Sequence, residues 1–343
     1  MGPSGSGKTT LLNVLARRTA TAKAKVSGQL LVDEQTVSLS TFRSIASFVE
    51  QEDALIGSLT ARETIEIAGH LARPKTSTRT GRKAMTAQLL AAFGLNTCAD
   101  TLIGTPIRKG ISGGQKRRVS VASQLVTGPK ILFLDEPTSG LDSTASREVM
   151  SYIRKVAKEL KLIVIASIHQ PSTQTFQLFD KLALLSDGKL CFFGAIDNVD
   201  SYFSGIGHPI PQHTNIAEHL LDLVNADFEG AADVRLIQDS WKEHAASNSS
   251  SALGDHGDSN DHYQRSGGSA VDAAFVMVPL LKRSIMKSYR DVLAYGVRYA
   301  MYLGLAIMMG TVWLRLKTEQ DYIQSFINAI VSSALHISPV DCH

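Results

Sequence analysis

The sequence predicts an α/β protein with a P-loop core, an inserted helical subdomain and apolar helices toward the C-terminus. Three observations support this fold class. Residues 2–9 match the phosphate-binding pattern G-x-x-x-x-G-K-[ST], and the residues after them have the apolar spacing of a helix. Residues 131–134 form an apolar run typical of a buried strand, and two carboxylates follow it. Residues 58–128 change to helical spacing with helix-capping signals.

Composition excludes several classes of protein. The chain has 343 residues, of which 44% are hydrophobic and 20% charged, so it can bury a full core and is not a disordered tail. The formal net charge of +3 is small and the basic residues are scattered, which argues against a nucleic-acid partner. The cysteines lie far apart, as is typical of a reducing cytosol rather than a disulfide framework. They are Cys98, Cys191 and Cys342.

The P-loop is expected to bind phosphate groups. Its glycines let the backbone turn so that successive N–H groups point at an anion beside a helix N-terminus. The Lys8 ammonium is expected to reach the outer phosphates, and the Thr9 hydroxyl to bind Mg²⁺, which prefers oxygen ligands. The residues expected to contact the nucleotide here are Gly2, Pro3, Ser4, Gly5, Ser6, Gly7, Lys8, Thr9 and Thr10.

The segment after the P-loop predicts strands and then helices. Short apolar runs at 29–32 and 46–49 indicate strands, and Gln51 follows the second. A glutamine at a strand end is more often a solvated residue than a ligand. Thr60 to Glu63 form a capping box that begins a helix, and a second helix is predicted over about 82–93, ending at Gly94.

Two adjacent glycines mark a second helix start. Ser112 and Gln115 form a capping box, so a well-capped helix is the simplest interpretation. That interpretation leaves Gly113 and Gly114 unexplained. Paired glycines at a helix N-terminus make an exposed anion site, suited to a phosphate that comes from elsewhere.

Polar side chains follow two of the expected strands. Asp135 and Glu136 come after the apolar run at 131–134; beside a P-loop, the first carboxylate would serve the Mg²⁺ shell and the second would polarise an attacking water. The strand predicted over 162–168 ends at His169. A lone histidine there is usually structural, but this one is the third polar group delivered to the same sheet edge. Asp187-Gly188 then predicts a hairpin.

Taken in order, these motifs resemble the nucleotide-binding domain of ATP-binding cassette transporters. The matching segments are Walker A at Gly2 to Thr9, the Q-loop residue Gln51, the signature at Ile111 to Gln115, Walker B at Ile131 to Glu136, the D-loop at Ser139 to Asp142 and the switch residue His169. The sequences from Ser167 to Ser172 and from Gly140 to Ser143 resemble those of the G subfamily, of the White and pleiotropic-drug-resistance type. The signature has Ile111 where leucine is the consensus, a conservative change.

The resemblance implies an ATPase that uses ATP and Mg²⁺. Two such domains would form a head-to-tail homo- or heterodimer, and each ATP would lie between one P-loop and the partner subunit's signature segment. The residues this assigns to the partner's nucleotide are Ser112, Gly113, Gly114 and Gln115. The residues it assigns to catalysis are Glu136 as general base, His169 as the γ-phosphate contact, Asp142 of the D-loop and Gln51. The residues it assigns to Mg²⁺ are Thr9, Gln51 and Asp135.

The rest of the chain predicts a membrane connection. The boundaries expected are an ATPase domain over 1–205, with its helical subdomain at about 58–128, an extension over 206–246 and a disordered linker over 247–270. Residues 275–343 are expected to hold an amphipathic connecting helix, one membrane span at about 295–314 and a weaker one at about 322–340. A buried soluble helix is the alternative for the first span. We therefore expect an integral membrane protein whose ATPase domain lies in the cytosol.

The function expected is that of an ATPase subunit, or a fragment of one, in an exporter of lipophilic molecules or lipids. A soluble cassette ATPase of translation or DNA repair, and a non-functional truncated gene product, are the alternatives. Only Met1 precedes the P-loop, which normally follows a buried strand. We therefore expect a chain truncated at both ends that hydrolyses ATP poorly without that strand and the upstream aromatic residue that stacks on adenine in this family.

Overall fold

The computed structural model describes most of the chain. The described residues are 1–18, 26–28, 30–32, 35–72, 78–105, 107–211, 214–225, 234–248, 270–290 and 292–313, with Gln324 and Ile327. They fall into two compact units, Met1–Arg283 and Ser284–His343. The expected site residues all lie in the first unit.

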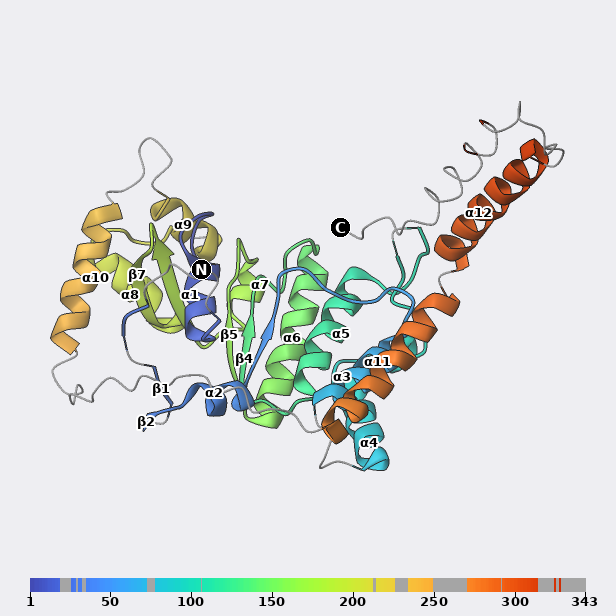
Figure 1. Ribbon diagram of the computed structural model, residues 1–343. Coiled ribbons are helices and arrows are strands. Elements are labelled where there is room, and N and C mark those ends of the chain that lie inside the picture. Colours follow the sequence, from blue (N-terminus) through green and yellow to red (C-terminus); the bar gives the residue numbers. More distant parts are fainter. Residues whose placement is uncertain are drawn as a thin grey trace. The chain divides into compact units, whose positions relative to one another are not determined.

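A parallel three-stranded sheet forms the centre of the first unit. Its strands are β3 (Ala46–Val49), β4 (Ile131–Leu134) and β5 (Ile163–Ala166), with β4 in the middle (Figure 1). Val49, Leu134 and Ala166 are register partners. Because parallel strands end at the same edge, the residues that follow all three strands come together there.

The alternation of side chains along β4 explains how helices cover both faces of this sheet. Leu132 and Leu134 pack in a cluster with α5 (Gly113–Leu125) and α6 (Ser143–Leu160). Ile131 and Phe133 point the other way and pack with α1 (Lys8–Leu15) and α2 (Leu39–Ile45). All four β4 side chains are buried, so β4 is held from both faces.

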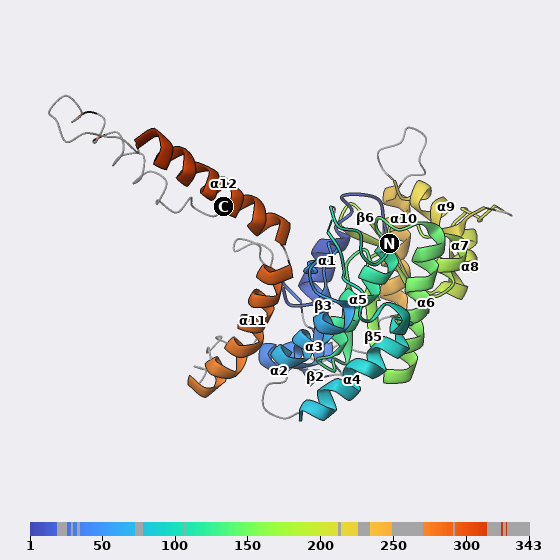
Figure 2. The same ribbon diagram turned by 90° about the vertical axis from the view of Figure 1, so that its right-hand side faces the viewer.

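A β-hairpin forms another sheet of this unit. Strands β6 (Lys181–Ser186) and β7 (Lys189–Ala195) are antiparallel, and Asp187 and Gly188 between them have φ of 47° and 71°. Positive φ at both turn positions is what a type I′ hairpin requires, so the predicted hairpin is confirmed. Further helices accompany the hairpin, and Figure 2 shows them on its side of the unit. They are α7 (Thr173–Phe176), α8 (Val199–Gly205), α9 (Ile216–Leu223) and α10 (Val234–Asn248).

The start of the P-loop is attached to the hairpin. The Met1 ammonium donates to the Ala183 carbonyl at 2.7 Å, and Leu185 N–H donates to the Met1 carbonyl at 2.9 Å. An apolar cavity of about 630 Å³ separates β5 from β6 and is also lined by α1. The P-loop is thus held by α1 on one side and by β6 on the other.

The inserted region is helical, as predicted, and consists of α3 (Ala61–Ala72), α4 (Arg79–Ala92) and α5. The Thr60 hydroxyl accepts from Glu63 N–H while the Glu63 carboxylate accepts from Thr60 N–H, which confirms the first capping box. Helix α4 begins earlier than the predicted residue 82, because the Thr78 hydroxyl caps it by accepting from Gly81 N–H. Of the predicted strands, 46–49 is β3, and the described part of 29–32 contains β1 (Leu31–Val32), paired with β2 (Gln35–Thr36); Gln29 lies outside the described residues.

The C-terminal part contains α11 (Ala270–Arg290) and α12 (Val292–Trp313). Among the helices that the structure describes, none combines the length and the apolar character needed to cross a membrane. The span expected at 295–314 is therefore not confirmed. The expected linker residues 249–269, and the second span at 322–340 apart from Gln324 and Ile327, lie outside the described residues, as does Cys342.

Candidate functional site

The P-loop has the conformation that phosphate binding requires. Gly5 and Gly7 have φ of 76° and 88°, which side-chain-bearing residues rarely adopt. Gly7 is the N-cap of α1 and no side chain caps that helix, so its first N–H groups stay available to an anion. At Gly2, an added Cβ would lie 2.3 Å from the Leu185 carbonyl oxygen, so close packing excludes any larger residue.

Two buried polar groups in the loop fit a phosphate group. The Lys8 side chain is buried, and its ammonium donates to the carbonyls of Gly2 and Pro3 at 2.9 and 2.8 Å. Burial lowers the pKa of Lys8, an effect that the nearby Glu136 and Asp135 carboxylates oppose. The Ser6 hydroxyl is buried and has no hydrogen-bond partner among the described residues. An anion in the loop would supply the counter-charge and the missing partner.

The carboxylate after β4 connects to the P-loop. Thr9 Oγ1 donates to Asp135 Oδ1 at 3.2 Å, and Ser167 Oγ donates to the same oxygen at 2.6 Å. Asp135 is buried and Thr9 exposed. A threonine hydroxyl beside a carboxylate suits Mg²⁺, which takes few protein ligands and keeps its other positions for phosphate oxygens and water. Gln51, the third expected Mg²⁺ residue, bonds Glu136 instead.

Glu136 is held in a strained backbone conformation. Its φ is 42°, in the left-handed region that is unfavourable for a residue with a side chain. Ser167 Oγ accepts from Glu136 N–H at 2.8 Å, and Gln51 Nε2 donates to the Glu136 carboxylate at 2.8 Å. These bonds fix both the backbone and the side chain of Glu136 at the sheet edge.

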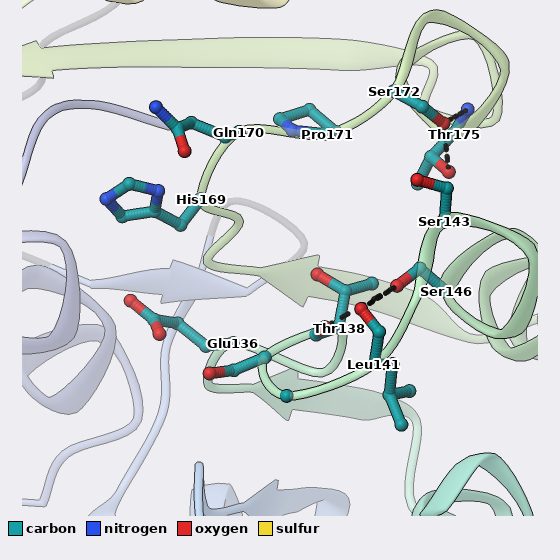
Figure 3. Close-up of a pocket in the computed structure, with 12 residues that line it drawn as sticks. Glu136, Thr138, Leu141, Ser143, Ser146, His169, Gln170, Pro171, Ser172 and Thr175 are labelled. Atoms are coloured by element: carbon teal, nitrogen blue, oxygen red, sulfur yellow. Dashed lines mark hydrogen bonds between the residues drawn. The ribbon is translucent and has the colours of Figure 1, made fainter.

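His169 follows β5 at the same edge. Its Nε2 lies 3.3 Å from Ser4 Oγ of the P-loop. Figure 3 shows His169 and Glu136 pointing to the same side of a polar cavity of about 370 Å³. The cavity is also lined by the turn from Thr138 to Leu141. The expected P-loop, Q-loop, Walker B and switch residues are therefore in one network.

The signature segment is not part of that network. Ser112 and Gln115 form the predicted capping box, with Oγ accepting from Gln115 N–H at 3.3 Å and Gln115 Oε1 accepting from Ser112 N–H at 2.9 Å. Ser112 and Gly113 are exposed. Within the described part of the chain, neither contacts the P-loop through a hydrogen bond. Asp142 is the N-cap of α6 and accepts from Ala145 N–H at 2.7 Å, so its expected catalytic role stays a prediction.

Two residues of this region were not predicted as functional. Ser167 joins Asp135 to the Glu136 backbone, and Arg117 of α5 bonds the backbone after both β3 and β4. The only sequence signal for Arg117 was its position in an apolar stripe that also contains Lys116 and Arg118. A run of basic residues more often indicates a solvated face, but Arg117 and Arg118 are buried.

Family models match two parts of the chain. The model described as ABC transporter covers residues 1–139, and the model described as ABC-2 type transporter covers residues 169–244. ABC transporter G family member 11 of Arabidopsis thaliana is 36% identical over 94% of this chain and 49% of its own length. Member 13 of the same organism is 42% identical over 70% of this chain and 35% of its own length.

The chain belongs to the G family of ABC transporters. It spans about half the length, or less, of these curated relatives. The segment matched by the ABC-2 model, residues 169–244, contains the β6–β7 hairpin, α7 to α9 and most of α10 of the first unit. One solved structure, of a dimeric ATP-binding cassette bound to ADP and Pi, aligns with a TM-score of 0.46 and 26% identity over 57% of this chain and 83% of that chain.

Proposed function

We propose that this chain binds and hydrolyses ATP with Mg²⁺ as the ATPase part of a G-family membrane transporter that moves lipophilic molecules or lipids. The observation that carries the proposal is the network at the sheet edge, in which Thr9 bonds Asp135, Gln51 bonds Glu136 and Ser4 contacts His169. It joins the phosphate loop to a positioned carboxylate and an imidazole. Membership in the G family favours a transporter over a soluble cassette ATPase.

Each polar group has a distinct task in this proposal. Lys8 and the N–H groups of the P-loop neutralise the phosphates, and Thr9 and Asp135 hold the Mg²⁺ shell, where the cation offsets phosphate charge. Glu136 accepts the proton of the attacking water, and Gln51 fixes the orientation of the Glu136 carboxylate. His169 donates toward the outermost phosphate.

The site is proposed to be completed by a second subunit. Ser112 to Gln115 lie at the start of helix α5 and outside the P-loop network, and Ser112 and Gly113 are exposed. In a head-to-tail dimer, this helix start would contact the ATP held by the other subunit's P-loop. The membrane is the proposed location, with the ATPase unit on the cytosolic side.

The decisive test is Glu136→Gln in the full chain reconstituted in lipid vesicles. The amide keeps the shape of the side chain but cannot accept a proton, so ATP binding should persist while phosphate release slows by about 10² to 10⁴-fold. Glu159→Gln, on the exposed end of α6, is the matched control and should keep the wild-type rate. An unchanged rate in Glu136→Gln would remove Glu136 from the role of base.

A further inference from the structure

Arg117 uses every hydrogen-bond donor of its guanidinium group. The residue lies on α5, just after the signature segment, and its side chain is only 3% exposed. A guanidinium has five N–H donors. Its five acceptors are the carbonyls of Pro137 (from Nε, 3.1 Å), Glu50 (from Nη1, 2.8 Å), Gln51 (from Nη2, 2.8 Å) and Glu136 (from Nη2, 2.9 Å), and Asp53 Oδ1 (from Nη1, 2.8 Å).

These acceptors belong to the two segments that carry the reactive side chains. One is the loop after β3, which contains Gln51, and the other is the turn after β4, which contains Glu136. Four of the five acceptors are backbone carbonyl oxygens. The binding of the Arg117 guanidinium therefore depends mainly on backbone geometry and not on charge pairing. One side chain therefore connects α5 to both segments.

Arg117 also supports the strained turn at Glu136. A φ of 42° persists only where neighbouring groups hold the backbone in place. The Glu136 carbonyl accepts from Arg117, and the Glu136 N–H donates to Ser167. The two bonds lie on opposite sides of the same residue and fix its peptide groups.

We propose that Arg117 is a positioning residue that ties the helix start bearing the signature segment to Gln51 and Glu136. The inference rests on the proposed function: if the signature segment contacts the partner subunit's ATP, Arg117 transmits any shift of α5 to the carboxylate that acts on the subunit's own ATP. The two nucleotide sites of a dimer are then connected through one guanidinium in each subunit.

The chemistry of this contact selects arginine over lysine. A lysine ammonium has three donors on a single nitrogen and cannot reach five acceptors spread over two segments. Arg118 provides a matched control on the same helix. It is also buried, bonds the Phe93 carbonyl and Glu148, and stacks on Tyr152; among the described residues it makes no hydrogen bond to the loop after β3 or the turn after β4.

The test compares Arg117→Lys with Arg118→Lys in the full chain. Hydrogen–deuterium exchange is measured for the amides of residues 50–53, 136 and 138–140, and kcat and KM for ATP are measured in vesicles. Arg117→Lys should speed exchange in both segments about tenfold, because at least two bonds are lost. It should lower kcat by about 10 to 100-fold with KM within about threefold, since misplacing a reactive group costs rate rather than binding. Arg118→Lys should lower Tm without either effect.

Two results would overturn the inference. One is exchange at residues 50–53, 136 and 138–140 that matches the wild type in Arg117→Lys. The other is an equal loss of kcat in both variants, which would mean that α5 stability alone matters. A wild-type chain that carries the strand normally preceding the P-loop and still releases phosphate only as fast as the same chain with Glu136→Gln would refute the proposed function. The exchange measurement needs no ATP and would still decide whether Arg117 positions the two segments.

Discussion

At Ser167, one hydroxyl serves both residues of the carboxylate pair. It donates to Asp135 Oδ1 and accepts from Glu136 N–H, and the side chain is 5% exposed. Ser167→Ala leaves the half-buried Glu136 N–H without a partner, so we expect a loss of about 1 to 3 kcal/mol in the free energy of unfolding. Turnover should also fall, because the Glu136 turn loses one of its anchors. Urea unfolding and ATPase rates measure the two effects.

Ser186→Ala is the control for that substitution. Ser186 is equally buried and donates to the Val224 carbonyl at 2.6 Å, in the core behind the β6–β7 hairpin. The Ser186→Ala variant should lose a similar free energy of unfolding, and its folded fraction should keep the wild-type turnover. A parallel loss of turnover in both variants would show that Ser167 acts only through stability.

The thiol of Cys191 predicts how stability depends on pH. Burial raises its pKa from 9.0 to about 11, partly opposed by hydrogen bonds from Gln238 and the Ser186 backbone. The unfolded thiol ionises near pH 9 and the folded one near 11. The contribution of the protonated Cys191 thiol to the free energy of unfolding is therefore complete below pH 9. It is lost as pH rises from about 9 to 11, at up to about 1.4 kcal/mol per pH unit. The decrease in urea midpoint from about pH 8 to pH 10.5 should be smaller in Cys191→Ala than in the wild type. An identical decrease in both proteins would contradict this assignment.

Residue types and spacing in the sequence were enough to predict most side chains of the site, but not their contacts. The P-loop, Asp135 and Glu136 are recognisable from the residue types that a nucleotide site needs, whereas Gln51 and His169 were assigned through the resemblance to ABC transporters. The Ser167 bridge could not be predicted, since it depends on the register of β4 with β5. Serine has no spacing rule that reveals such a contact.

At the scale of elements, glycines decide how closely two loops approach. Gly57 packs on the loop at Gly104, and an added Cβ would lie 2.6 Å from the Gly104 carbonyl oxygen. Gly57→Ala should therefore lower the free energy of unfolding by about 1 to 3 kcal/mol. At Gly81, exposed in the first turn of α4, an added Cβ would meet no atom nearer than 3.4 Å, so Gly81→Ala should be neutral or stabilise by up to about 1 kcal/mol. Equal losses in the two variants would refute the packing argument.

Elements defined by neighbouring residues were predicted best. Both capping boxes and the Asp187-Gly188 turn are formed by residues within three positions of one another, and the structure confirms them. The buried position of Arg117 was not predictable, because its acceptors lie 19 to 67 residues away along the chain. Long-range contacts of this kind depend on how β3 and β4 pair.

For the whole molecule, the sequence pattern predicts which segments lie in the membrane less well than it predicts the site residues. The apolar stretch predicted as a span forms α12, a helix of 22 residues, yet Arg298 and several polar residues lie within it. Length and helical form were thus predicted, and membrane crossing was not confirmed. The reason is that the exposed apolar side chains of a helix can be covered either by lipid or by another protein surface. The sequence of the helix does not distinguish these two environments.

The proposed dimer makes a prediction that belongs to the assembled molecule. Ser112→Arg places a bulky cation at the exposed start of α5, where the partner subunit's nucleotide would lie. It should abolish hydrolysis in a homodimer while the same subunit still binds ATP, at a cost of about 1 kcal/mol for the lost helix cap. Lys8→Ala should instead abolish binding at the subunit's own P-loop. Each variant alone thus inactivates both sites of its homodimer.

Mixing the two variants tests how the sites are shared. In a dimer of one Ser112→Arg subunit and one Lys8→Ala subunit, head-to-tail sharing places both lesions in one composite site and leaves the other intact. That dimer should hydrolyse ATP at about half the wild-type rate if the sites act independently. When both substitutions are in one subunit and the partner is wild type, each site carries one lesion, and hydrolysis should be lost. Tagged subunits purified as mixed dimers allow both rates to be measured, and equal rates in the two arrangements would refute the head-to-tail site.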